Sequence, residues 1–163
     1  MDFHILLVPF EQKHILRNLL EIYLHDMSEF DDEKDPLELN DAGLYGYGYL
    51  DYYWNEKGRY PYLLTADGKP AGLSFIRTIK TNPLTFEVAE FFVVRKYRKT
   101  GAGTVLISKM FEWHKGEWVI NTPIKNTIAQ HFWRKAVKDA AAGEYKEYPT
   151  EDGRRLEWAF SNG

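Results

Sequence analysis

The chain has 163 residues, 44% of them hydrophobic, which predicts one globular domain over residues 1–163 with a substantial core. Its 21 basic and 24 acidic residues give a net charge of −3, so no basic field favours nucleic acid as a partner. Cysteine is absent, which excludes disulfides, thiolate metal sites and cysteine nucleophiles. The sequence has no membrane-spanning apolar run and no signal-peptide pattern, so we expect a cytoplasmic protein that does not insert into membranes.

The first third of the chain predicts a strand, a helix and a long loop. Phe3–Val8 is a short apolar run that ends at a proline, which favours a strand. Apolar residues then recur at helical spacing over about Glu11–His25. The acidic stretch Asp26–Asp41 contains a proline and few large apolar residues, which is typical of a loop. Tyr49–Asn55 predicts a short helix.

The rest of the chain predicts three consecutive antiparallel strands and then alternating strands and helices. Tyr60–Thr65 and Pro70–Ile79 flank a tight Asp-Gly turn, and Thr85–Val94 follows as the third strand. The remaining predicted elements are a helix ending near Trp113, a strand at Trp118–Asn121, a helix at Asn126–Val137 and a hairpin of Glu144–Tyr148 and Arg155–Phe160.

This order predicts an α/β fold in a single domain. We expect a mixed, mainly antiparallel central sheet of about seven strands with flanking helices. The strand, turn, helix and strand in the middle form a βαβ unit, which predicts a parallel strand pair with a right-handed connection.

The segment Arg98-Lys99-Thr100-Gly101-Ala102-Gly103 lies between a predicted strand and a predicted helix. The first turn of a helix has backbone N–H groups without partners, and the helix dipole favours negative charge there. Small residues and glycines let a phosphate approach those N–H groups closely. Arg95, Lys96, Arg98 and Lys99 add positive charge, so the segment predicts a diphosphate site.

Two nucleotide motifs do not fit this turn. A Walker loop needs Lys and then Ser or Thr after its second glycine, whereas Gly103 is followed by Thr104 and Val105. A dinucleotide fingerprint needs a third glycine, where this chain has Leu106. A helix start that binds no ligand remains an alternative, but it leaves the second glycine and the basic cluster as coincidences.

The stretch from Val93 to Gly103 resembles the acetyl-coenzyme A signature of the GNAT family of N-acetyltransferases. The core of that signature is Gln or Arg, two residues, Gly, one residue, and Gly or Ala. Asn126, Ala129 and the pair Phe132-Trp133 resemble the family's helix after the fifth strand. The predicted element order is also that of the family, so the resemblance covers nearly the whole chain.

The resemblance implies a set of residues that bind acetyl-CoA as cosubstrate. The backbone of the strand before the turn pairs with the pantetheine arm like an added strand, and the turn holds the pyrophosphate. Asn126 contacts the pantetheine from the other side or caps the last helix, and Trp133 packs beside the cofactor. The other implied cofactor-binding residues are Phe92, Val93, Val94, Arg98, Lys99, Thr100, Gly101, Ala102, Gly103 and Thr104.

Acetyl transfer to an amine needs a base and an oxyanion donor. By resemblance the base lies on the strand before the turn, where Glu87 and Glu90 are the candidates. Strand alternation places them on opposite faces unless a bulge intervenes. We favour Glu90, which is closer to the inferred thioester, and Glu87 is the second choice; either one is alternatively a carboxylate in a salt bridge. The oxyanion donor is expected to be a backbone N–H near Val93.

The family's usual acid is a tyrosine, and Trp133 stands at the matching position. Indole has no proton that titrates in the useful range, so the thiolate leaves unassisted or another tyrosine or a water serves. The sequence predicts an N-acetyltransferase that uses acetyl-CoA and a primary amine of a small molecule or protein. The alternative is a CoA-binding or acyl-CoA-binding protein without catalysis, as a sensor or structural subunit.

Three further expectations concern ligands and assembly. The five histidines have no metal-ligand spacing, so no metal is expected. The acidic Asp26–Asp41 stretch is either a solvated loop or attracts a cationic amine, and the aromatic Tyr45–Tyr62 segment either covers the core or lines the acceptor pocket. The protein is expected to be a monomer or a homodimer.

Overall fold

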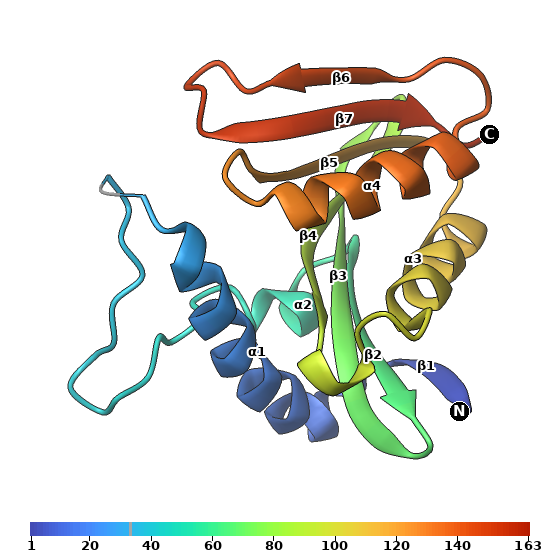
Figure 1. Cartoon of the computed structure of the whole chain (residues 1–163). Helices are drawn as coiled ribbons and strands as arrows, with labels where there is room; N and C mark the ends of the chain where they lie inside the picture. Colours follow the sequence, from blue (N-terminus) through green and yellow to red (C-terminus); the bar gives the residue numbers. More distant parts are fainter. Residues whose placement is uncertain (33) are drawn as a thin grey trace.

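The computed structural model describes residues 1–32 and 34–163. Within them a seven-stranded sheet has the order β1-β2-β3-β4-β5-β7-β6 (Figure 1). All neighbouring strands are antiparallel except β4 and β5, which are parallel as expected. The strands are β1 (Phe3–Leu7), β2 (Arg59–Ala66), β3 (Lys69–Thr81), β4 (Leu84–Val93), β5 (Glu117–Pro123), β6 (Lys146–Pro149) and β7 (Arg155–Ser161).

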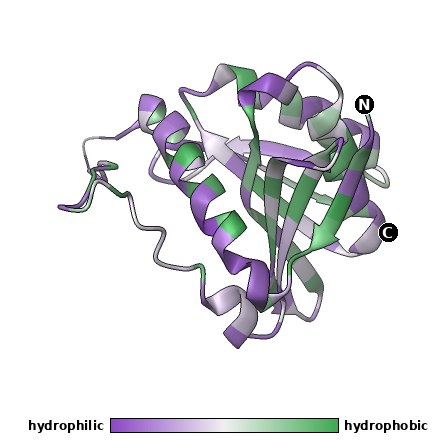
Figure 2. Cartoon of the chain, turned by 90° about the horizontal axis from the view of Figure 1, so that it is seen from below, coloured by the Kyte–Doolittle hydropathy of each residue, from purple (hydrophilic) through white to green (hydrophobic). Residues whose placement is uncertain are grey.

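Helices cover both faces of this sheet. They are α1 (Lys13–Met27), α2 (Tyr52–Asn55), α3 (Ala102–Trp113) and α4 (Thr127–Ala140). Leu16 and Leu20 of α1 and Tyr53 of α2 pack with Leu73 and Phe75 of β3. On the opposite face a second, larger core joins α3 and α4 to the sheet through residues that include Leu106, Val137, Ile76 and Ile120. In Figure 2 the central strands are mostly coloured as hydrophobic, whereas α1 carries both hydrophobic and hydrophilic residues.

The structure confirms the predicted fold and element order, with shifted boundaries. The first helix begins as a 3-10 turn at Phe10–Gln12 and continues as α1 to Met27, two residues beyond the predicted end. The helix expected at Tyr49–Asn55 has only the four residues of α2. Asp67 and Gly68 both have positive φ, 49° and 77°, which suits the predicted tight hairpin turn between β2 and β3.

The strands β4 and β5 pair over a short distance only. Thr85–Glu87 lies beside Glu117–Val119, and no pairing between the two strands continues beyond these residues. In the same region the register between β3 and β4 shifts, because Ile76 faces Val88 whereas the preceding Phe75 faces Glu90. Ala89 is therefore the extra residue of a β-bulge. The short pairing with β5 and the bulge at Ala89 both lie in β4, the strand that precedes the glycine turn.

Candidate active site

The glycine turn has a backbone that suits an anion. Lys99 and Gly101 both have positive φ, 61° and 90°, and α3 begins at Ala102. Gly101 occupies the N-cap position and therefore has no side chain that could accept from the first-turn N–H groups. The Thr100 hydroxyl donates to the carbonyl of Tyr97 at 2.5 Å, which stabilises the conformation of the turn. The first N–H groups of α3 thus lie at an end of the helix that no side chain caps.

Two glycines allow close approach around this turn. A Cβ on Gly103 would lie 3.2 Å from the ring of Phe132, so glycine lets the start of α3 approach α4. A Cβ on Gly72 of β3 would lie 2.4 Å from the carbonyl oxygen of Phe92, so glycine is required beside the end of β4. Neither role was evident from the sequence pattern.

Asp26, at the end of α1, holds two of the basic residues near the turn. Its carboxylate accepts from Arg95 at 2.8 Å and from Arg98 at 2.5 Å. Partial burial acts to raise the pKa of Asp26, but the hydrogen bonds and charges of Arg98 and Arg95 outweigh it and hold that pKa below its usual range. The first carboxylate of the acidic Asp26–Asp41 stretch is therefore engaged in ion pairs within the protein. Asp32 likewise pairs with Arg154.

At the end of β4, the backbone N–H and C=O of one residue point away from β3. The N–H of Val94 donates to the carbonyl of Ala71 at 2.8 Å, so Val94 faces β3. Because backbone groups alternate along an antiparallel strand, the N–H and C=O of Val93 point to the other side, where β5 no longer pairs. Arg98 Nε already donates to the Val93 carbonyl at 2.8 Å. The Val93 N–H is consequently the outward donor among the three predicted pantetheine-binding residues.

The bulge in β4 places Glu87 and Glu90 on the same face of the sheet. Phe86 and Val88 belong to the core under α3 and α4, so Glu87 points to the opposite face. Glu90 also points there, because its carboxylate meets side chains of the α1 and α2 face. The expected separation of the two carboxylates onto opposite faces is thus removed by the bulge at Ala89. Glu87 pairs with Arg77 at 2.9 Å, which matches the salt-bridge alternative for this residue.

The half-buried Glu90 side chain holds its carboxyl beside two tyrosine hydroxyl groups. The Tyr47 hydroxyl donates to its Oε1 at 3.3 Å, and the Tyr23 hydroxyl also interacts with it. Burial raises the pKa of Glu90 to about 7, although the two tyrosines and the positive charge of Arg155 act to lower it. The negative charge of Glu87 adds to the rise. A carboxyl that titrates near neutral pH is suited to accept a proton there.

Three neighbours of Glu90 were not among the predicted site residues. Tyr23 comes from α1, Tyr47 from the loop before α2, and Arg155 from β7. Arg155 Nε donates to Oδ1 of Asn121 on β5 at 2.5 Å, which holds its guanidinium on this side of the sheet. Of the three, only Tyr47 could have been suspected from the sequence, because it lies in the aromatic segment expected to line a pocket or cover the core.

Asn126 and Trp133 both have structural roles on α4. Asn126 is the N-cap, and its side chain accepts from the N–H of Ala129 at 3.1 Å. Trp133 is 5% exposed, and its ring lies 5.0 Å from those of Phe91 and Phe132. A contact of either residue with a cofactor stays a prediction.

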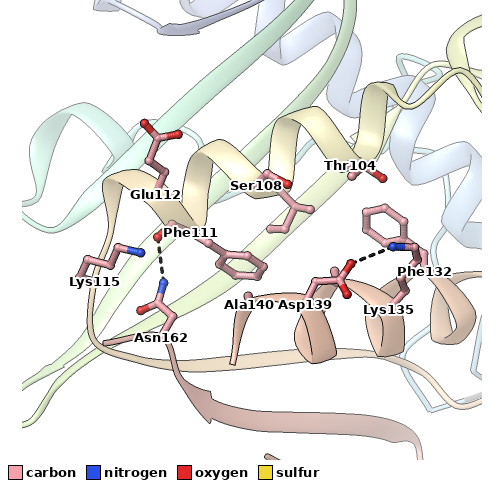
Figure 3. Close-up of a pocket in the computed structure, with 12 residues that line it drawn as sticks. Thr104, Ser108, Phe111, Glu112, Lys115, Phe132, Lys135, Asp139, Ala140 and Asn162 are labelled. Carbon is pink, nitrogen blue, oxygen red and sulfur yellow. Dashed lines mark hydrogen bonds and ion pairs between the residues drawn. The ribbon is translucent and has the colours of Figure 1, made fainter. Parts of the chain in front are cut away.

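A groove of about 350 Å³ runs between α3 and α4 (Figure 3). It begins at Thr104, one turn or less from the glycine turn, and Phe132 and Lys135 of α4 line its other side. At its far end the Asn162 side chain donates to the carbonyl of Phe111 at 2.8 Å, as the dashed line in Figure 3 shows.

Two other kinds of feature are absent from residues 1–32 and 34–163. There, no group of three or more potential metal-ligating side chains comes together. No helix in the same residues is long and apolar enough to span a membrane.

Comparison with known protein families shows which family the chain belongs to. The model described as the acetyltransferase (GNAT) family matches residues 16–137. The chain therefore belongs to the GNAT family of acetyltransferases. No curated protein matches the chain significantly.

Solved structures show the same fold at low sequence identity. An acetyltransferase of the GNAT family from Staphylococcus aureus Mu50 has a TM-score of 0.68 and 15% identity, over 99% of this chain and 100% of that one. The PaiA N-acetyltransferase from Thermoplasma acidophilum, in complex with coenzyme A, has a TM-score of 0.66 and 14% identity, over 99% of each chain. The ribosomal-protein-S18-alanine N-acetyltransferase from Escherichia coli has 0.61 and 14%, over 99% of this chain and 95% of that one.

Proposed function

We propose that the protein transfers an acetyl group from acetyl-CoA to a primary amine, with Glu90 as the base. The observation that carries this proposal is the position of Glu90. Its half-buried side chain, with a pKa of about 7, is three residues before the outward N–H of Val93 on the same strand. A proton acceptor and a backbone donor are the two groups that acyl transfer to an amine requires of the protein.

The residues present fit acetyl-CoA. The uncapped start of α3 and the positive φ values of Lys99 and Gly101 suit the diphosphate. The Val93 N–H suits the pantetheine arm or the thioester oxygen, because the edge of β4 is not paired with β5 there. The groove that begins at Thr104 suits the nucleotide end, and on its wall Lys135 pairs with Asp139 at 2.8 Å. The coenzyme A complex of the Thermoplasma protein supports this assignment at the level of the fold.

Arg98 has a second possible partner in this assignment. In the structure its guanidinium contacts Asp26 and the Val93 carbonyl, although the side chain stays 43% exposed. We propose that it holds the end of β4 against the turn and joins the diphosphate when the cofactor binds.

The chemistry assigns one role to each group. When bound, acetyl-CoA supplies a thioester whose carbonyl carbon forms a bond to the amine nitrogen while its bond to sulfur breaks. Glu90 accepts the proton that the substrate ammonium loses before its nitrogen can attack, and the nitrogen releases a second proton to solvent as the amide forms. The Val93 N–H donates to the oxygen that gains negative charge. The released thiolate takes up one proton from solvent, and its low basicity lets it leave without an acid at the position of Trp133.

Two measurements test this proposal. Titration calorimetry with acetyl-CoA tests cofactor binding, and thiol release over a panel of primary amines tests transfer. We expect micromolar binding and amine-dependent thiol release that falls by at least about a hundredfold in Glu90→Gln, as for removal of a general base. The matched control is Glu117→Gln, an exposed carboxylate on β5. Binding without amine-dependent release would instead support the non-catalytic CoA-binding alternative, and absence of binding would overturn both.

A further inference from the structure

A second, basic pocket lies on the sheet face that contains Glu90. It has a volume of about 330 Å³ and is open to solvent, at the start of β2 and towards the end of β3. The residues that line it are Glu56, Lys57, Arg59, Arg77, Thr78 and Ile79. Three of these six side chains are cationic, and none of them was singled out from the sequence.

Strand register connects this pocket to the candidate base. Arg59 of β2 pairs with Arg77 of β3, which pairs with Glu87 of β4, so the three side chains form one row on one face. Phe75, two residues before Arg77, pairs with Glu90. Two residues along a strand span about 7 Å, so the row and Glu90 are that far apart along β3.

The Tyr53 hydroxyl feels the charges of both positions. Burial and the negative charge of Glu90 raise the pKa of Tyr53 to about 12, while the charges of Arg59 and Arg77 act to lower it. Tyr53 is therefore within electrostatic range of both the base and the basic row.

The charges in the pocket do not cancel. Arg59 pairs with Glu56 at 2.8 Å, and Arg77 pairs with Glu87 at 2.9 Å. Lys57 forms no ion pair with any residue in the described parts of the chain, so the group keeps one positive charge. The Nε of Arg77 is buried and has no hydrogen-bond partner within these parts. The Arg77 side chain is 38% exposed and Glu87 accepts from only one of its terminal nitrogens, so the exposed part of the guanidinium can meet an anionic ligand.

Arg59 is also held in place. Its guanidinium lies over the rings of Tyr52 and Tyr53, at 5.4 and 5.3 Å from their centroids. Stacking of this kind fixes the planar group before a ligand arrives and lowers the entropy that binding costs. Glu56 and Glu87 each accept from a single nitrogen of Arg59 and Arg77, so both guanidinium groups keep further donors for a ligand carboxylate, which can accept two parallel hydrogen bonds.

We propose that the acceptor is a small amine that carries a carboxylate, which binds at Arg77 and Arg59 while its amino group reaches Glu90. This inference rests on the proposed function and names the substrate class of the same site. The spacing along β3 favours ω-amino carboxylates whose two ends are separated by a short methylene chain. The probe is 5-aminopentanoate, and pentylamine is the matched amine that lacks the carboxylate.

The test measures binding and turnover separately. Calorimetry on the protein saturated with coenzyme A compares the two amines, and an acetyl-CoA thiol-release assay compares their kcat/KM. We expect 5-aminopentanoate to bind at least about tenfold more tightly than pentylamine, the size expected for a hydrogen bond to a charged group. Arg77→Gln and Arg59→Gln should each reduce this preference severalfold or more. Lys69→Gln, which removes an exposed cation at the other end of β3, should preserve it.

The possible outcomes are distinct. Equal binding of the two amines overturns the carboxylate inference, whether or not either amine is acetylated. The inference is also overturned if Arg155→Gln abolishes the preference for 5-aminopentanoate while Arg77→Gln and Arg59→Gln both retain it. The carboxylate would then bind beside β7. Preferential binding of 5-aminopentanoate without thiol release from any amine supports the pocket and contradicts the proposed transfer. Thermal unfolding of each variant checks that it folds. If Arg77→Gln does not fold, the comparison of the two amines is made with Arg59→Gln.

Discussion

The Tyr47 hydroxyl donates a hydrogen bond to Oε1 of Glu90 at 3.3 Å, and so connects the loop before α2 to the bulge in β4. That loop is itself anchored on α1, because the N–H groups of Tyr45 and Gly46 donate to the carboxylate of Glu21 at 2.6 and 3.1 Å. The protonation of the candidate base therefore depends on a segment 43 residues away in the sequence.

The pH dependence of activity should follow from this arrangement. Glu90 accepts a proton only when ionised, so kcat/KM should rise with pH and level off above the pKa of about 7. Tyr47→Phe removes a donor that favours the ionised form, which should raise the apparent pKa by about 0.5 to 1 unit. The measurement is kcat/KM against pH.

The matched control is Tyr49→Phe, because Tyr49 is 62% exposed and touches the ring of Tyr47 without bonding Glu90. An unchanged profile in Tyr47→Phe, or an equal shift in Tyr49→Phe, would contradict the role of this hydrogen bond.

Replacing the base should stabilise the fold. Burial raises the pKa of Glu90 from 4.5 to about 7, so the ionised carboxylate costs the folded state free energy. The cost is absent below pH 4.5, grows through the interval and is complete above about pH 7. Glu90→Gln should therefore raise the free energy of unfolding at pH 8.5 by at most roughly 3 kcal/mol, with little change at pH 4.5.

Urea unfolding of both proteins at the two pH values measures this difference. An equal effect of Glu90→Gln at both pH values would show that ionisation of this carboxyl does not strain the fold.

Local patterns sufficed for most of the fold and for the glycine turn. The Asp67-Gly68 turn and the glycine turn at the start of α3 were predictable because glycine and its neighbours favour positive φ within a few residues. The pattern that marks an apolar helix face likewise placed α3 and α4, because that periodicity is a property of one segment.

The surroundings of Glu90 were not predictable in this way. The bulge at Ala89 inserts one residue against β3, and no residue type in Val88-Ala89-Glu90 marks it. Tyr23 and Arg155 approach Glu90 only because α1 and β7 fold against β4, so their roles depend on long-range packing. The two glycines that permit close approach, Gly72 and Gly103, are likewise explained by neighbours distant in sequence.

Loss of the Asp26 carboxylate should strengthen cofactor binding. Asp26 pairs with Arg95 and Arg98, and its depressed pKa keeps it ionised at neutral pH. If Arg98 joins the diphosphate, Asp26 competes with it for the same guanidinium. Asp26→Asn should then lower the Kd for acetyl-CoA severalfold, and added salt should reduce the gain.

Calorimetry at low and high salt gives this comparison, with Asp41→Asn as the control, because Asp41 is an exposed carboxylate in the next loop. Weaker binding in Asp26→Asn would mean that the ion pair organises the turn rather than competing with the ligand.

The glycine turn can be tested by charge at constant size. A Cβ on Gly101 meets no atom within 4 Å, so a longer side chain has room, although φ of 90° strains any residue other than glycine by roughly 1–2 kcal/mol. Gly101→Gln and Gly101→Glu share that strain and differ only in charge. Both should fold, and Gly101→Glu should bind acetyl-CoA at least about tenfold more weakly than Gly101→Gln, because its carboxylate repels the diphosphate at the start of α3. Calorimetry gives the two Kd values and thermal unfolding confirms equal stability, whereas equal affinities would place the diphosphate away from this turn.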